Sequence, residues 1–87
     1  MISEKEINYV IEKITRRFEI ELPLEYEKFD IDNDNLYISF QKSEISRTFE
    51  LSEGITLEFD NNSRIIGLKV DNVTDFLPKQ SNEVSNS

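Results

Sequence analysis

The chain has 87 residues, of which 18 are acidic and 10 are basic, so its formal net charge is −8. It contains neither cysteine nor histidine, which excludes disulfides, thiolate metal sites and histidine-dependent catalytic triads. The length suffices for one small domain, and the acidic charge argues against nucleic-acid binding, which relies on Lys and Arg.

A helix is predicted over residues 3–18. Ser3 is a natural N-cap, and Glu6 stands three residues later, which is the pattern of a capping box. Apolar residues then recur at helical spacing, at Ile7, Val10, Ile11, Ile14 and Phe18. This segment is therefore expected to bury one face.

Four or five antiparallel strands are predicted after the helix. The first is expected over residues 24–30, after Pro23, with a bulge near residues 27–28. The segments LYISF, EISRTFEL, ITLEF and RIIGLKV then alternate apolar and polar residues between turns. Gly54 is expected in the left-handed conformation, and residues 61–62 are expected to supply positive φ. We expect a β-meander with one apolar face.

A short helical turn capped by Asn72 or Thr74 is predicted to end before Pro78, and a polar tail over residues 79–87 is expected to be disordered. The fold class is therefore α+β, as a single domain over residues 1–78.

Self-association follows from the size of the predicted sheet. A helix about 24 Å long cannot cover five strands alone, so a second copy of the chain is expected to cover part of the apolar face. The residues expected in the core or at this homo-oligomer interface are Ile7, Ile11, Ile14, Leu36, Tyr37, Ile38, Phe40, Phe49, Leu57, Phe59 and Leu68.

Two groups of carboxylates are candidate sites. Asp30, Asp32 and Asp34 have the spacing that opens a calcium-binding EF-hand loop, but the required glycine and final glutamate are missing, so a hairpin turn is favoured. Glu58 and Asp60 are expected on one outward face, where a solvated surface is favoured over a catalytic pair. No catalytic residue and no cofactor are predicted.

The acidic residues concentrate in residues 19–34, where Lys28 is the only basic residue. Such a segment keeps a protein soluble, and it could also attract a basic protein partner. The first residues lack the pattern of a signal peptide, and no apolar run is long enough to span a membrane, so a cytoplasmic location is expected.

Several motifs over residues 24–77 resemble the prokaryotic family called domain of unknown function 2283. They are Phe29-Asp30, the run from Asp34 to Ile38, Gly54-Ile55, Asp60, and the run from Arg64 to Lys69. Two positions depart from the family's pattern: Ser63 replaces a turn glycine, and Lys69 replaces a glutamate. The helix over residues 3–18 lies outside the pattern, as an extension.

The resemblance implies a compact β-rich fold without an established activity. Some relatives are encoded beside toxin-like proteins, which implies an antitoxin-like role. The leading hypothesis is a non-enzymatic, self-associating interaction module. The alternatives are an acidic inhibitor of a basic protein partner and a carboxylate-based metal-binding protein or enzyme.

Overall fold

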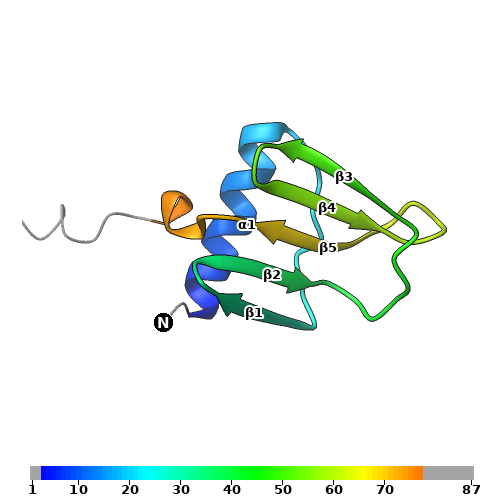
Figure 1. Ribbon diagram of the computed structural model, residues 1–87, viewed down its shortest axis with the longest axis horizontal. Coiled ribbons are helices and arrows are strands. Elements are labelled where there is room, and N and C mark those ends of the chain that lie inside the picture. The colour runs from blue at the N-terminus through cyan, green and yellow to red at the C-terminus, as the bar shows by residue number, and fades with distance from the viewer. Residues whose placement is uncertain (1–2, 78–87) are drawn as a thin grey trace, which may run out of the picture.

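The computed structural model describes residues 3–77, and its first element is helix α1, Glu4–Phe18 (Figure 1). The predicted capping box is confirmed: the Glu6 amide donates to the Ser3 hydroxyl at 3.3 Å, and the Ser3 amide donates to the Glu6 carboxylate at 2.8 Å. Glu19 adopts the left-handed conformation, with φ of 53°, and ends the helix. The predicted tail over residues 79–87 lies outside the described residues.

Five antiparallel strands follow the helix. They are β1 (Lys28–Asp32), β2 (Asn35–Ser39), β3 (Arg47–Ser52), β4 (Ile55–Phe59) and β5 (Ile65–Val70). A 3-10 helix, η1 (Val73–Phe76), comes after the last strand. One helix, an antiparallel sheet and a short C-terminal helical turn confirm the predicted α+β class.

The order of the strands differs from the predicted meander. It is β1-β2-β5-β4-β3, because β5 returns to pair with β2 instead of lying at an edge. Strands β2 to β5 therefore form a Greek key, and the connection over residues 40–46 passes the ends of β5 and β4 to reach β3 (Figure 1). Alternating apolar residues determine which face of a strand is buried, but they do not determine its neighbours.

The first strand begins later than predicted, at Lys28 instead of residue 24. A two-residue turn at Asn33 and Asp34, with φ of 52° and 65°, sets the register of the β1–β2 hairpin. Pairing is continuous from Lys28 with Ser39 to the turn, so no bulge is needed near residues 27–28. Residues 24–27 form a connector, and the Leu24 side chain is exposed.

The core lies between α1 and one face of the sheet, and α1 crosses the strands (Figure 1). The buried residues of α1 are Ile7, Val10, Ile11 and Ile14. The sheet residues in the same cluster are Leu36, Ile38, Phe40, Ile55, Leu57, Leu68 and Val70. Burying such a side chain contributes roughly 1.5–3 kcal/mol, so α1 is a major part of the stability.

The helix does not cover this face alone. Leu22, which lies between α1 and the connector, and Val73 and Phe76 of η1 belong to the same core cluster, and the central strands are fully covered. The two edges of this face are less covered: Phe49 on β3 is 55% exposed and Ile31 on β1 is 37% exposed. The opposite face of the sheet, called the open face below, carries no described helix (Figure 1). Within residues 3–77, no helix is long and apolar enough to cross a membrane.

Candidate functional site

The open face has a polar pair at its centre. Tyr37 on β2 and Glu58 on β4 approach Gly67 of β5 from its two neighbouring strands: Glu58 is paired with Gly67, and Tyr37 is paired with Lys69, two residues further along β5. The Tyr37 hydroxyl donates a hydrogen bond of 2.8 Å to the Glu58 carboxylate. Burial, followed by this bond and the negative charge of Glu58, raises the pKa of Tyr37 to about 12. The pair is therefore a hydrogen-bond donor and acceptor locked together at neutral pH.

Gly67 provides the space for this pair. A Cβ atom at residue 67 would overlap the Glu58 carboxylate and lie 3.1 Å from the Tyr37 hydroxyl. The Glu58 residue is only 5% exposed, although no helix covers its face of the sheet. A glycine inside a strand often marks a place where another group packs closely against the backbone, so Gly67 is the sequence signal for this contact.

A hollow of about 260 Å³ lies beside this pair. Its lining includes the basic residues Lys28 and Lys42 and the acidic residue Glu27, together with Ser39 and Tyr37. Because both signs of charge line the hollow, its electrostatics do not favour either an anion or a cation.

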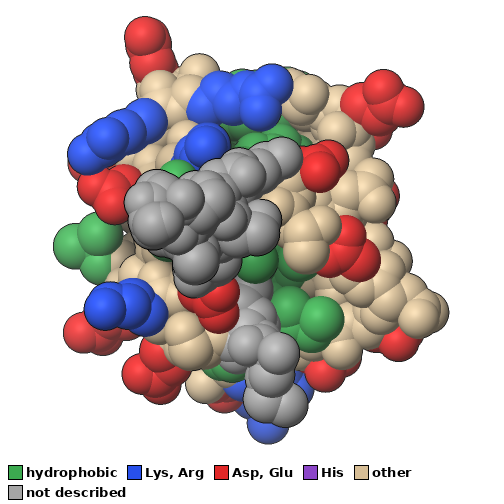
Figure 2. All heavy atoms as spheres, turned by 90° about the vertical axis from the view of Figure 1, so that its left-hand side faces the viewer, with side chains coloured by type: hydrophobic (Ala, Val, Ile, Leu, Met, Phe, Trp, Pro, Cys, Tyr) green, Lys and Arg blue, Asp and Glu red, His purple; other side chains and the backbone are tan. Residues whose placement is uncertain are grey.

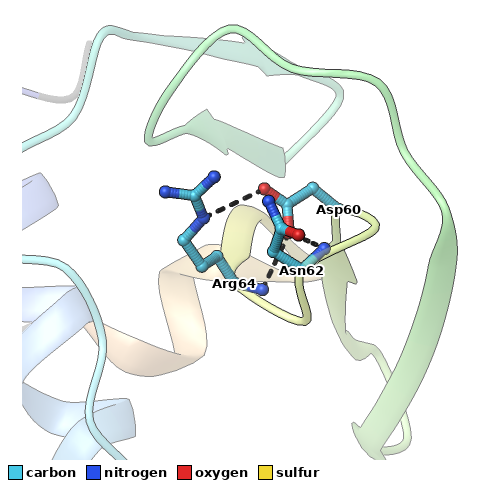
Figure 3. A network of polar contacts seen from close by, with 3 residues as sticks. All are labelled: Asp60, Asn62 and Arg64. Carbon is cyan, nitrogen blue, oxygen red and sulfur yellow. Dashed lines mark hydrogen bonds and ion pairs between the residues drawn. The ribbon is translucent and has the colours of Figure 1, made fainter.

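The prediction that Glu58 and Asp60 lie on a solvated face is wrong, because each residue is only 5% exposed. Asp60 lies beyond the end of β4 and has its own partners instead of pairing with Glu58. Its carboxylate accepts hydrogen bonds from the Asn62 and Arg64 amides, both at 2.9 Å, and from the Arg64 guanidinium at 3.3 Å (Figure 3). The Arg64 amide, followed by the other Asn62 and Arg64 contacts, outweighs burial and lowers the pKa of Asp60. This network holds the β4–β5 turn in shape.

The positive φ of this turn is at Ser63 and not at residues 61–62, where the sequence predicted it. Ser63 has φ of 60°, and its amide donates to the Asp60 carbonyl at 3.0 Å. Gly54, by contrast, has the positive φ that was predicted for it, 85°. A non-glycine residue in this region is strained by roughly 1–2 kcal/mol. This strain explains why a glycine suits position 63.

The three candidate metal ligands do not converge. Asp30 and Asp32 are exposed on β1, whereas Asp34 lies in the following turn and is partly buried. The Asp34 carboxylate accepts hydrogen bonds from the Thr74 hydroxyl at 2.9 Å and from the Thr74 amide at 3.3 Å. Within residues 3–77, no cluster of three possible metal ligands is present. Asp34 instead fastens η1 to the β1–β2 hairpin, a contact that sequence spacing did not indicate.

A second hollow lies between α1 and the β3–β4 turn and has a volume of about 630 Å³. Lys13 and Arg17 line it from the helix, while Glu53, Asp71 and Asp75 line it from the other side. Figure 2 shows basic and acidic side chains interspersed on this side of the molecule. The mixture gives no preference for a ligand of one charge.

The residues predicted for the core or the interface divide into three groups by burial. Buried residues of the helix and the central strands are Ile7, Ile11, Ile14, Leu36, Ile38, Phe40, Leu57 and Leu68. Tyr37 and Phe59 are partly buried, and Phe49 is exposed. Phe49 pairs with Leu57 and therefore lies on the helix side of the sheet, but it is not one of the buried core residues. It is thus the exposed aromatic residue of an edge strand.

The family comparison matches residues 28–73, which run from the first residue of β1 to the first residue of η1. The matching model is described as a protein of unknown function, DUF2283. The chain belongs to the DUF2283 family. No curated protein and no solved structure matches it.

The DUF2283 match contains the whole sheet and its Tyr37–Glu58 pair, the Asp60 turn and the β3 edge. Helix α1 lies outside the match, although four of its residues are in the core. Membership in this family adds no activity to the chemistry of the site.

Proposed function

We propose that this DUF2283 protein is a non-catalytic, self-associating protein-interaction module. Phe49 is the observation that carries the proposal. This residue is 55% exposed on a strand at the edge of the sheet, whereas the core residues of the neighbouring strand β4 are buried. Burying the exposed half of such a ring is worth roughly 1 kcal/mol per copy, and a second copy of the chain can bury two rings at once.

The titratable side chains of the site support a structural role over a catalytic one. The side chain of Tyr37 is hydrogen-bonded to that of Glu58, Asp60 is hydrogen-bonded to Arg64, and Asp34 is hydrogen-bonded to Thr74. Each contact stabilises a strand pair, a turn or the attachment of η1. Glu58 and Asp60 are also each only 5% exposed, so little of either carboxylate is accessible to a substrate.

The solution mass of the unmodified chain tests this proposal. Light scattering is measured from tens of micromolar to about 1 mM. At about 1 mM, even a weak association of about 4 kcal/mol places half of the chains in the dimer. We expect the mass to rise from 10.3 kDa toward twice that value. Since each chain carries a charge of −8, added salt should strengthen association by screening repulsion. A mass of 10.3 kDa over the whole range would refute the proposal.

A second candidate function is the binding of a basic protein, and Leu24 favours it. This side chain is 88% exposed in the connector before β1, and the neighbouring acidic residues Glu21, Glu25 and Glu27 are exposed as well. An apolar residue between carboxylates matches a partner that presents an apolar pocket with a basic rim. The same connector belongs to the acidic segment over residues 19–34.

Co-purification from the native host tests this candidate. We expect a basic protein to be retained in stoichiometric amount by the unmodified chain and to be lost with Leu24→Asn, which keeps the charge of the segment. Phe49→Asn serves as the matched control on the other surface. Retention of the basic protein by the Leu24→Asn variant, or its absence with the unmodified chain, would contradict this second candidate.

A further inference from the structure

We infer that the edge of β3 binds β3 of a second copy, in an antiparallel pair with its two-fold axis at Phe49. This inference rests on the proposed self-association and specifies its partner and register. The product is a continuous sheet of twice five strands, with both α1 helices on the same face. The following structural features lead to this arrangement.

The β3 edge is open to a further strand. It is the last strand in the order of the sheet, and its residues 47–50 are all exposed. An edge strand presents unpaired backbone N–H and C=O groups, which are a template for another strand. Arg47 and Glu50 give this short segment no net charge, so two copies can approach each other without strong local repulsion.

The other edge of the sheet, β1, is less suited to pairing with itself. Asp30 and Asp32 alternate with Phe29 and Ile31 along the strand, so both carboxylates lie on the open face. Pairing two copies of β1 about its central residue would place Asp30 against Asp30, and like charges directly opposite are destabilising. Charged residues on an edge strand are a common protection against such pairing.

The pleat of the sheet limits the possible registers of β3. In an antiparallel pair that continues a sheet, opposite residues share a face, so the two-fold axis must pass through a residue. An axis at Phe49 places the two Phe49 rings opposite each other and places each Thr48 opposite Glu50 of the other copy. Opposed aromatic pairs are favourable contacts between strands.

The neighbouring registers are less favourable. An axis at Glu50 would place two carboxylates opposite each other. An axis at Thr48 would place Phe49 opposite Arg47, whose guanidinium already lies 4.4 Å from the centre of the Phe59 ring and donates to the Ser63 hydroxyl at 3.2 Å. The irregular pairing between Glu50 and Ser52 limits the ladder at its other end. The Phe49 axis covers the exposed ring and leaves Arg47 in place.

Cysteine cross-linking tests the register, and the chain has no cysteine of its own to interfere. Thr48→Cys and Glu50→Cys chains are prepared separately, mixed and mildly oxidised. Opposite Cα atoms of an antiparallel pair are about 4.5–5.5 Å apart, which is the separation that a disulfide needs. We expect a disulfide-linked dimer in the mixture and none with either variant alone. Asp30→Cys, an exposed position on β1, is the control for random collision, and it should form no disulfide-linked dimer.

Other results would overturn the inference. Cross-linking of Thr48→Cys by itself would place the axis at residue 48, and cross-linking of Glu50→Cys by itself would place it at residue 50. If the unmodified chain has the mass of a dimer but the mixed variants do not cross-link, the β3 pairing is wrong while self-association stands. If the unmodified chain is a monomer at every concentration, the proposed function itself fails.

Discussion

The Tyr37–Glu58 pair predicts an unusual response to the substitution Gly67→Ala. The new methyl group would overlap the Glu58 carboxylate, so Glu58 must move and its 2.8 Å hydrogen bond with Tyr37 must break. Losing a hydrogen bond to a charged group costs roughly 1.5–3 kcal/mol. Replacing glycine with alanine by itself stabilises the folded state by about 0.4–1 kcal/mol, because alanine lowers the conformational entropy of the unfolded chain. We therefore expect a net loss of about 1–2 kcal/mol.

Urea unfolding measures this loss, and the Glu58→Ala background provides the decisive control. Without the carboxylate, the nearest atom to the methyl group is the Tyr37 hydroxyl oxygen at 3.1 Å, which can shift slightly. In that background Gly67→Ala should be stabilising by about 0.4–1 kcal/mol, so the sign of its effect should reverse. Independent effects of the two substitutions on stability would show that Glu58 is not held over Gly67.

Alkaline titration of tyrosine absorbance gives a second readout, with Tyr37→Phe used to assign the signal. The pKa of Tyr37 should fall from about 12 in the Gly67→Ala variant, because the bond to Glu58 is one of the causes that raise it. A raised pKa in the folded state contributes stability below the unfolded value near 10, and this stability is lost as the pH rises toward 12. An unchanged Tyr37 pKa in Gly67→Ala would contradict the geometry of the pair.

Four further substitutions test the turn and the core. Ser63→Gly should leave stability unchanged or raise it by up to about 1 kcal/mol in thermal unfolding, because φ of 60° strains serine, whereas Asn62→Gly should lower it by about 0.5–1 kcal/mol. Asp60→Asn should lower stability at pH 7. Since the folded pKa of Asp60 lies below 3.8, the difference from the unmodified chain should shrink as the pH falls through that folded pKa. Ile14→Ala should cost about 2–5 kcal/mol, although residue 14 lies outside the DUF2283 match, and a loss below 1 kcal/mol would show that α1 is peripheral.

Local signals in the sequence were sufficient for the elements and for most of the buried face. The capping box at Ser3 and Glu6 and the apolar spacing of α1 act within a few residues, so they could be recognised without the structure. Alternation along β2, β4 and β5 likewise indicated Leu36, Leu57 and Leu68, which are buried. These features depend on local geometry and on the side of a strand or helix that a residue occupies.

Features that depend on the order of the strands could not be predicted in the same way. The return of β5 to β2 depends on the path of residues 40–46, and it brings Tyr37, Gly67 and Glu58 together on the open face. Because β3 lies at an edge, Phe49 is exposed. Phe49 nevertheless has the same place in the alternation of β3 that buried Leu57 has in the alternation of β4. Ser63 has positive φ because of the hydrogen bonds around Asp60, which no pattern of apolar residues encodes.

Self-association through the β3 edge is most directly tested by the solution mass of three chains, measured side by side against concentration. They are the unmodified chain, Phe49→Glu, and Leu24→Glu, which adds the same charge at the 88% exposed Leu24 position. We expect the unmodified chain and Leu24→Glu to approach twice 10.3 kDa, and Phe49→Glu to stay at 10.3 kDa while unfolding at a similar temperature. Equal masses for Phe49→Glu and the unmodified chain would contradict the account.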